Sequence, residues 1–198
     1  MPVAQLIDLD RRAQMATIFA SAFQDEPALS YIIPDPTERA VRLPSLFHLL
    51  IESDDKSGLQ YMTEDGAAAA LWRRPGQARL GWKEMLSQAR PMVSALGPHL
   101  VRALRVSHAM EQRFPTTPFW YLHYVGCERS RQRSGLGAEV VRAGLAHVDG
   151  YPIYLETADP DNIPFYEQLG FSITSHWRTF PGGPSFWSLL SNDAVGRL

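Results

Sequence analysis

The chain has 198 residues, 45% of them hydrophobic and 20% charged, and its formal net charge is -2. This length suits one domain with a continuous core, and the composition excludes the disordered and fibrous classes. The small net charge also gives no general attraction for nucleic acid, since nonspecific binding needs several clustered lysines and arginines. We therefore expect a single globular domain over 1–198 that does not bind nucleic acid.

Cysteine content and hydropathy bear on location. Cys127 is the only cysteine, so an internal disulfide is excluded, and Met1-Pro2-Val3 does not begin a charged-then-apolar signal peptide. No apolar run approaches the roughly 20 residues that a bilayer span requires. These features predict a cytoplasmic protein without a membrane partner.

The N-terminal region predicts two helices. Apolar residues recur at helical spacing over 15–23, with Asp8 or Asp10 available as N-cap, and again over 43–51, where Pro44 is expected to kink the helix. Two stretches beside the helices have loop chemistry: 24–27 and 33–36.

A hairpin and a helical insertion follow. Strands over 59–63 and 67–73 flank Glu64-Asp65-Gly66, a turn signal that competes with the helix preference of four consecutive alanines. The segment 82–114 has helical periodicity interrupted by Pro91 and by Gly97-Pro98, which predicts two or three helices.

The C-terminal half alternates strands and helices. The run 119–127 is apolar, aromatic and β-branched, as is typical of a central strand buried on both faces. The elements expected after it are a helix over 135–147, a strand over 153–156, a short helix over 164–169 that Gly170 ends, strands over 171–178 and 185–190, and a tail over 191–198.

The turn between strand 119–127 and the following helix has the features of an anion site. A helix N-terminus presents free N–H groups, and Gly135 and Gly137 lack the Cβ that would keep a phosphate from the backbone. Arg129, Arg131 and Arg133 add positive charge nearby. The pattern predicts a pyrophosphate ligand, and the alternative is that the glycines only permit a tight turn.

Two familiar nucleotide-binding motifs do not fit this turn. A P-loop needs Gly-Lys-Ser or Gly-Lys-Thr, but Ala138-Glu139 follows Gly137. A dinucleotide-binding fingerprint needs a third small residue where Val140 stands.

The segment Gln132-Arg133-Ser134-Gly135-Leu136-Gly137 resembles the signature of the GNAT acetyltransferase superfamily. That signature is Gln or Arg, then any two residues, Gly, any one residue, and Gly or Ala. A second block, Asn162 to Phe171, resembles the family's Asn, Phe-Tyr and Gly-Phe pattern. The resemblance is specific over about 119–171, and the helical insertion is longer than in the simplest members. It implies an α/β (α+β) fold with a mixed, mostly antiparallel sheet, helices on both faces, and a V-shaped splay between two central parallel strands.

The resemblance also implies acetyl-CoA as the cofactor. Backbone amides of the turn would surround the pyrophosphate, and two strand residues would pair with the pantetheine arm, which is an amide chain able to extend a sheet. The residues to which it assigns cofactor binding are Val125, Cys127, Gln132, Arg133, Ser134, Gly135, Gly137, Ala138, Asn162 and Phe165.

Acetyl transfer from a thioester to an amine needs a neutral amine and a proton donor for the leaving thiolate. Tyr166 occupies the position where many family members place a tyrosine near the CoA sulfur, so the resemblance implies that it is the general acid. The alternative is that Tyr166 only packs the short helix.

The general base has two candidates. Some family members carry a glutamate where this chain has Tyr121, so that base is absent, whereas His123 lies close to a histidine of arylalkylamine-type members. Strand alternation would put His123 on the face of Tyr121 and Val125. Glu156 on the next strand is the competitor, acting directly or through a water, and a purely structural role remains open for both residues.

The acceptor site is expected to have aromatic walls near the entrance loop. Asp25 and Glu26 would attract a cationic amine, unless they are an ordinary solvated pair. The expected walls are Phe23, Tyr31, Trp72, Trp120, Tyr121 and residues of the 82–114 helices. No metal is expected, because the remaining histidines lack paired metal-ligand spacing, and the Cys127 side chain is assigned to packing rather than to catalysis.

The sequence therefore predicts a GNAT-type N-acetyltransferase that moves an acetyl group from acetyl-CoA directly to the primary amine of a small molecule. Two rivals stay open: acetylation of a protein N-terminus or lysine, and an acyl-CoA-binding module without chemistry. The oligomeric state also stays open, and a homodimer is one alternative.

Overall fold

The computed structural model describes residues 5–6, 11–79 and 81–191, and within helix 82–96 it leaves out the side chains of 82–85. In these ranges the strands form one mixed sheet in the order β1-β2-β3-β4-β5-β7-β6. β4 and β5 run parallel and all other neighbours run antiparallel, which confirms the predicted sheet. The strands are β1 Gln5–Leu6, β2 Gly58–Met62, β3 Ala68–Arg73, β4 Trp120–Cys127, β5 Ile153–Thr157, β6 Ser172–Arg178 and β7 Ser185–Ser191.

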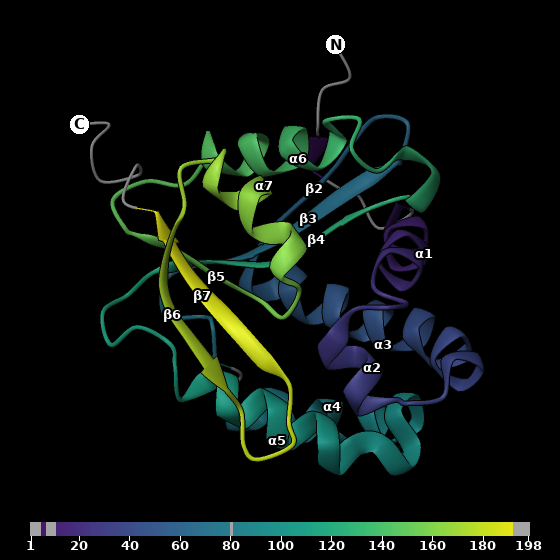
Figure 1. Cartoon of the computed structure of the whole chain (residues 1–198). Helices are drawn as coiled ribbons and strands as arrows, with labels where there is room; N and C mark the ends of the chain where they lie inside the picture. Colours follow the sequence, from purple (N-terminus) through teal and green to yellow (C-terminus); the bar gives the residue numbers. More distant parts are fainter. Residues whose placement is uncertain (1–4, 7–10, 80, 192–198) are drawn as a thin grey trace.

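Helices cover both faces of this sheet (Figure 1). α6 and α7 lie on one face, α1 and α3 lie on the other, and α4 packs on α3 with α5 next to it. None of the helices in the described ranges combines the length and apolar character that a bilayer crossing requires. The helices are α1 Arg12–Ala22, α2 Pro27–Ile32, α3 Pro36–Ser57, α4 Trp82–Leu96, α5 Leu100–Glu111, α6 Leu136–Leu145 and α7 Ile163–Glu167, with 3-10 turns η2 Gly97–His99, η3 Arg129–Arg131 and η4 Pro160–Asn162.

The helical insertion divides as the sequence indicates. It contains two helices separated at Gly97, whereas Pro91 lies inside α4 and does not end it. The sequence did not predict α2, because Pro27 reads as loop chemistry but is the first residue of that helix. The expected N-caps of α1, Asp8 and Asp10, lie outside the described residues.

The predicted hairpin of β2 and β3 is confirmed, and local turn chemistry explains why the alanines form a strand. Gly66 has φ 70°, a conformation that favours glycine. The Asp65 carboxylate accepts hydrogen bonds from the Thr63 hydroxyl at 2.7 Å and from the Ala67 amide at 3.1 Å. These contacts fix the reversal of the chain just before the alanine run.

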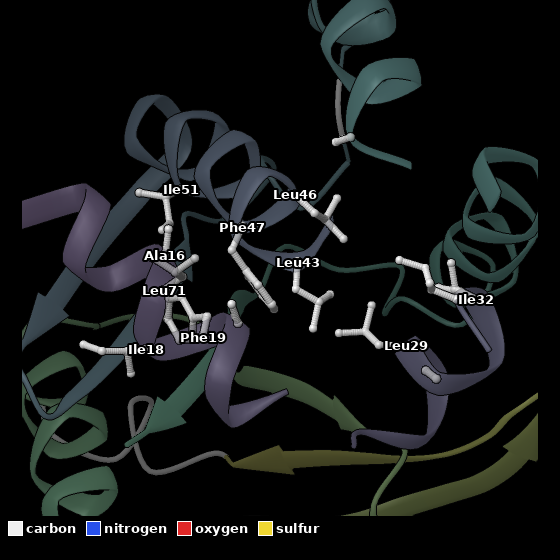
Figure 2. Packing of buried hydrophobic residues seen from close by; sticks show 14 of the residues in the cluster. Ala16, Ile18, Phe19, Leu29, Ile32, Leu43, Leu46, Phe47, Ile51 and Leu71 are labelled. Atoms are coloured by element: carbon white, nitrogen blue, oxygen red, sulfur yellow. The ribbon is translucent and has the colours of Figure 1, made fainter. Parts of the chain in front are cut away.

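Two buried clusters lie on opposite faces of the sheet. On one face, α1, α2 and α3 pack around Phe19, Leu43 and Phe47 (Figure 2). On the other face, α6 packs on the alternate residues of β3 and β4, including Trp72 and Leu122. Strand alternation thus divides the β3 alanines between the two cores, and their small side chains let both helix layers approach the sheet.

We expect Gly144→Ala to destabilise the fold by about 1–3 kcal/mol, as overpacking of a filled core does. A Cβ at Gly144 of α6 would lie 2.3 Å from the Trp72 indole, and Trp72 is fully buried. Urea unfolding measures the change in free energy. Gly81→Ala is the control, because a Cβ there meets nothing within 4 Å, and an equal loss in both variants would contradict this packing.

Candidate active site

The parallel pair β4 and β5 separates soon after it forms. Pairing is confined to Trp120 with Ile153 and Tyr121 with Tyr154, although β4 continues to Cys127 and β5 to Thr157. β3 and β7 remain paired along the outer sides of the two strands. The inner edges of β4 and β5 therefore diverge toward their C-terminal ends, which confirms the predicted splay.

The backbone on the open side of β4 belongs to the two residues that the sequence assigns to the pantetheine arm. The Glu128 amide donates to the Ala67 carbonyl at 2.8 Å, so this residue faces β3. Because hydrogen-bonding direction alternates along an antiparallel strand, the polar backbone groups of Val125 and Cys127 face away from β3. The Gln132 side chain makes a long hydrogen bond, 3.5 Å, to the Cys127 carbonyl. The pairing of Val125 and Cys127 with pantetheine stays a prediction.

The turn after β4 has two residues in the left-handed region. Arg133 has φ 62° and Gly135 has φ 89°, and Arg133 is the only non-glycine residue with positive φ in the described ranges. Such a conformation in a residue with a side chain costs about 1 kcal/mol or more and often marks a functional turn. Gly135 is the N-cap of α6 and no side chain caps that helix, so the first N–H groups of α6, those of Gly137 and Ala138 included, stay free for a ligand.

The arginines of this turn do not all serve as free positive charge. Arg129 pairs with Asp25 and donates to the Ser21 carbonyl at 3.0 Å, and Arg131 pairs with Asp65. These two side chains therefore tie the turn to α1 and to the β2–β3 hairpin. In the part of the chain that the structure describes, the Arg133 side chain has no ion pair, and it is exposed beside the free amides.

The two sequence blocks meet in space. A Cβ on Gly137 would lie 3.6 Å from the Phe165 ring of α7, so α7 packs against the first turn of α6. Tyr166 lies next to Phe165, at 5.0 Å between ring centroids, and next to Phe171, at 6.1 Å. Burial raises the pKa of the Tyr166 phenol, which keeps its proton at neutral pH. Asn162 is exposed at the start of α7.

His123 lies at an irregularity in β4. Leu71 pairs with Tyr124 and Trp72 with Leu122, so His123 is the extra residue of a β-bulge. The bulge makes one part of the expected alternation wrong. Tyr124 packs in the α1–α3 core on the face of His123, and Val125 packs with the α6 core on the opposite face.

His123 is held by a buried ion pair that sequence reasoning missed. Its Nδ1 lies 2.7 Å from Oδ2 of Asp54 on α3. Asp54 Oδ1 accepts a hydrogen bond from Arg73 Nε on β3 at 2.6 Å, and Arg73 Nη2 forms an ion pair with the same oxygen at 2.6 Å. Asp54 is fully buried. A signal existed in the sequence, because Asp54 follows Phe47 by seven residues and Ile51 by three, and therefore lies on the apolar face of α3.

These contacts set the protonation of both partners. Burial lowers the pKa of His123, and Arg73 lowers it further, so the imidazole is neutral at pH 7. Burial alone would raise the pKa of Asp54, but His123 and Arg73 outweigh it and lower this pKa, which keeps the carboxylate charged. The His123 side chain is 12% exposed.

Glu156 forms a second titratable cluster beside Tyr121. Its carboxyl accepts hydrogen bonds from Tyr154 Oη at 2.9 Å and from Tyr121 Oη at 3.4 Å. Burial raises the pKa of Glu156 to about 8, and the two tyrosine hydroxyls only partly offset this effect. The structure thus brings both candidate bases next to Tyr121, whose ring lies 5.1 Å from that of His123.

The entrance loop places its two carboxylates in different environments. Glu26 caps α2 by accepting from the Leu29 amide at 2.7 Å, and burial raises its pKa, with a further contribution from Asp159. Asp25 is exposed and pairs with Arg129, with Arg39 3.8 Å away. Both carboxylates thus already have partners within the protein, and acceptor binding by either residue stays a prediction.

Only some of the aromatic residues predicted to line the acceptor site lie on the same face of the sheet as His123. Phe23 packs edge-on against Tyr124 at 5.4 Å between centroids, and Tyr31 lies 5.9 Å from Phe180. Trp72 and Trp120 are buried in the α6 core, on the face opposite His123, so they cannot contact an acceptor there. The physical reason is strand alternation, because both tryptophans alternate with the residues that face α3.

The family model described as Acetyltransferase (GNAT) family matches residues 43–171. The chain belongs to this family. The matched residues include the splayed strands, the turn before α6 and the Phe165-Tyr166 pair, and GNAT membership makes the protein an acyltransferase. Acetyl-CoA is the acyl donor that GNAT enzymes generally use.

Comparisons with individual proteins agree with GNAT membership. An uncharacterized N-acetyltransferase of Schizosaccharomyces pombe is 24% identical over 181 residues, which are 85% of this chain and 73% of the relative. A Corynebacterium glutamicum structure, described as histone acetyltransferase HPA2 and related acetyltransferase, has a TM-score of 0.74 at 23% identity and covers 96% of this chain and 95% of its own. Arylalkylamine N-acetyltransferase 2 of Aedes aegypti has a TM-score of 0.55 at 11% identity, with 95% and 97% covered. The two structural likenesses establish a shared fold.

Proposed function

We propose that the protein transfers the acetyl group of acetyl-CoA directly to the primary amine of a small molecule. The observation that carries this proposal is the divergence of β4 and β5 between the uncapped N-terminus of α6 and the titratable pair His123–Asp54. The first feature suits a pyrophosphate followed by an amide chain, and the second suits proton removal from an amine.

The cofactor residues are proposed from the fit of the turn. Gly135 leaves open space at the N-cap, and the exposed Arg133 supplies a cation for a phosphate. The residues proposed to hold acetyl-CoA are those that the sequence assigns: Val125, Cys127, Gln132, Arg133, Ser134, Gly135, Gly137, Ala138, Asn162 and Phe165. When bound, acetyl-CoA supplies the acetyl group as a thioester.

Proton transfer is assigned to His123 and Tyr166. His123 is neutral at pH 7. It accepts a proton from the acceptor amine while the amine nitrogen forms its bond to the acetyl carbon. Tyr166 keeps its proton because burial raises its pKa, and it donates that proton to the departing sulfur. Glu156 is the less suitable base at pH 7, because a pKa of about 8 leaves most of its carboxyl protonated.

The proposal of a small acceptor rests on how the acceptor side is enclosed. The β6–β7 hairpin carries Phe180, which contacts Tyr31 of α2, and the Arg105 guanidinium of α5 lies 4.3 Å from the same ring. Figure 1 shows this hairpin reaching down to α5. A closed rim favours a small molecule over an extended protein segment.

The acceptor class is tested by comparing kcat/KM for small primary amines with that for peptides carrying a free N-terminus or a lysine. We expect small amines to be the better substrates by at least about tenfold. Phe180→Ala should narrow this difference by opening the rim. If the wild-type protein acetylates peptides as well as or better than small amines, the proposed small-molecule acceptor is wrong and the protein is a peptide or protein acetyltransferase.

The pH dependence of kcat/KM distinguishes the two candidate bases. A base acts in its deprotonated form, so activity rises with pH through the pKa of that base. The sequence alone suggests an apparent pKa near 6.5 to 7, but burial moves the His123 limb below 6.5. A limb from Glu156 would instead lie near pH 8.

We expect the limb below pH 6.5 to disappear in His123→Ala and to persist in Glu156→Gln. Initial rates are measured from pH 5 to pH 9 with saturating acetyl-CoA. The ionisation of the free amine is common to all variants and serves as the internal reference. A limb near pH 8 that only Glu156→Gln removes would assign the base to Glu156.

A further inference from the structure

We propose that Asp54 is a positioning residue for acetyl transfer, which holds the His123 imidazole in the tautomer whose Nε2 is free to accept the amine proton. This inference rests on the proposed function. It concerns Asp54 on α3, which lies outside the two sequence blocks of the family resemblance but contacts His123 in space.

The tautomer follows from the donors and acceptors available. An ionised carboxylate only accepts hydrogen bonds, so at 2.7 Å from Asp54 Oδ2 the His123 Nδ1 must carry the hydrogen. A neutral imidazole has a single N–H, and Nε2 is then left with its lone pair. The Asp54–His123 contact thus selects the nitrogen that can act as a base.

Arg73 prevents the carboxylate from rotating. Its Nε donates to Asp54 Oδ1 at 2.6 Å, its Nη2 lies 2.6 Å from the same oxygen in an ion pair, and its Nη1 donates to the Ala78 carbonyl at 3.0 Å. Both carboxylate oxygens therefore have fixed partners, one cation and one imidazole. Together with His123, Arg73 lowers the pKa of Asp54, which favours the charged form that only accepts hydrogen bonds.

The remaining neighbours of His123 orient the ring without competing for its nitrogens. The Tyr124 and Tyr121 rings lie 4.2 Å and 5.1 Å from the imidazole centroid. The charged and titratable groups that face His123 are Asp54 from α3, Arg73 from β3, and the two tyrosines from β4. An ion pair that served only the fold would be complete with Asp54 and Arg73, whereas here a bulge also turns a partly exposed histidine onto it.

Asp54→Asn tests the assignment because it reverses one donor. The amide oxygen must face Arg73, which only donates, so the amide NH₂ faces Nδ1 of His123 and forces the hydrogen onto Nε2. We expect kcat to fall at least about tenfold with the acetyl-CoA KM changed less than twofold, and we expect the pH limb below 6.5 to vanish. Unchanged kcat and an unchanged limb in a folded variant would overturn the proposal.

Two controls separate positioning from general damage. Asp55→Asn changes the neighbouring carboxylate, which is partly exposed and pairs with Arg12 at 2.6 Å, and should leave kcat unchanged. The double variant Asp54→Asn/His123→Ala should be no slower than His123→Ala, because residues that act as a unit are non-additive. Losses that multiply in the double variant would mean that Asp54 acts independently of His123.

Nitrogen-15 NMR of histidine in the wild-type protein tests the tautomer without relying on the stability of a variant. At pH 7 we expect the signal that disappears in His123→Gln to report hydrogen on Nδ1. Hydrogen on Nε2 instead, or on both nitrogens, would overturn the proposal. If no amine is acetylated by the wild-type protein, the proposed function fails, and the NMR result still decides the hydrogen bond to Asp54.

Discussion

Gly135→Asp is expected to weaken acetyl-CoA binding by at least about 100-fold while leaving the protein folded. Gly135 has φ 89° at the N-cap of α6, where a residue with a Cβ costs about 1 kcal/mol. A negative charge at this point also opposes a pyrophosphate and takes the free amides for its own side chain. The charge repulsion and the loss of the free amides amount to about 3 kcal/mol of binding free energy, which corresponds to roughly two factors of ten in affinity.

Gly135→Asn is the matched control for this change. Asparagine has nearly the same shape and also tolerates a positive φ, but it carries no charge. Calorimetric titration with acetyl-CoA should therefore show a clearly smaller loss for Gly135→Asn than for Gly135→Asp. No heavy atom lies within 4 Å of the added Cβ, so the only cost to the fold is about 1 kcal/mol of backbone strain, and both variants should melt within a few degrees of the wild type. Unchanged affinity for acetyl-CoA in a folded Gly135→Asp variant would show that the pyrophosphate does not bind at this turn.

Tyr166→Phe is expected to lower kcat by roughly 100-fold, with the KM for acetyl-CoA little changed. The phenyl ring retains the contacts with Phe165 and Phe171, so only the hydroxyl is lost. Because burial raises the pKa of Tyr166, its hydroxyl keeps the proton that it donates in the wild-type protein. In Tyr166→Phe the thiolate must leave without that proton.

Steady-state kinetics with free thiol as the readout measures this effect. Tyr151→Phe is the control, because Tyr151 is 43% exposed and lies outside the splay, and it should leave kcat unchanged. An unaltered kcat in Tyr166→Phe would return Tyr166 to a packing role. Such a result would favour the alternative that the protein binds acyl-CoA without catalysing acetyl transfer.

The elements that the sequence predicted are those with local causes. The β2–β3 hairpin depends on Thr63, Asp65 and Gly66, which lie within four residues of one another. The turn before α6 depends on Arg133 and Gly135, which have positive φ and lie two residues apart in the chain. Such features can be read from the sequence because every interaction that fixes them is close along the chain.

The elements that the sequence did not predict depend on distant partners or uncommon caps. α2 begins at a proline that reads as loop, and its cap is the side chain of Glu26. The bulge at His123 exists only through the register with β3, and the bond to Asp54 spans 69 residues. Trp72 was assigned to the acceptor wall because nothing in the sequence shows that Gly144 makes room for it on the opposite face.

The most direct test of acetyl transfer to a small amine is to mix the purified protein with acetyl-CoA and one primary amine at a time, across a library. Free thiol and acetylated amine are measured in the same sample, by a thiol reagent and by mass spectrometry. We predict that at least one small amine gives thiol release that matches the acetylated product mole for mole, and that Tyr166→Phe slows both signals equally. Binding of acetyl-CoA without amine-dependent thiol release from any amine or peptide would contradict the proposed function.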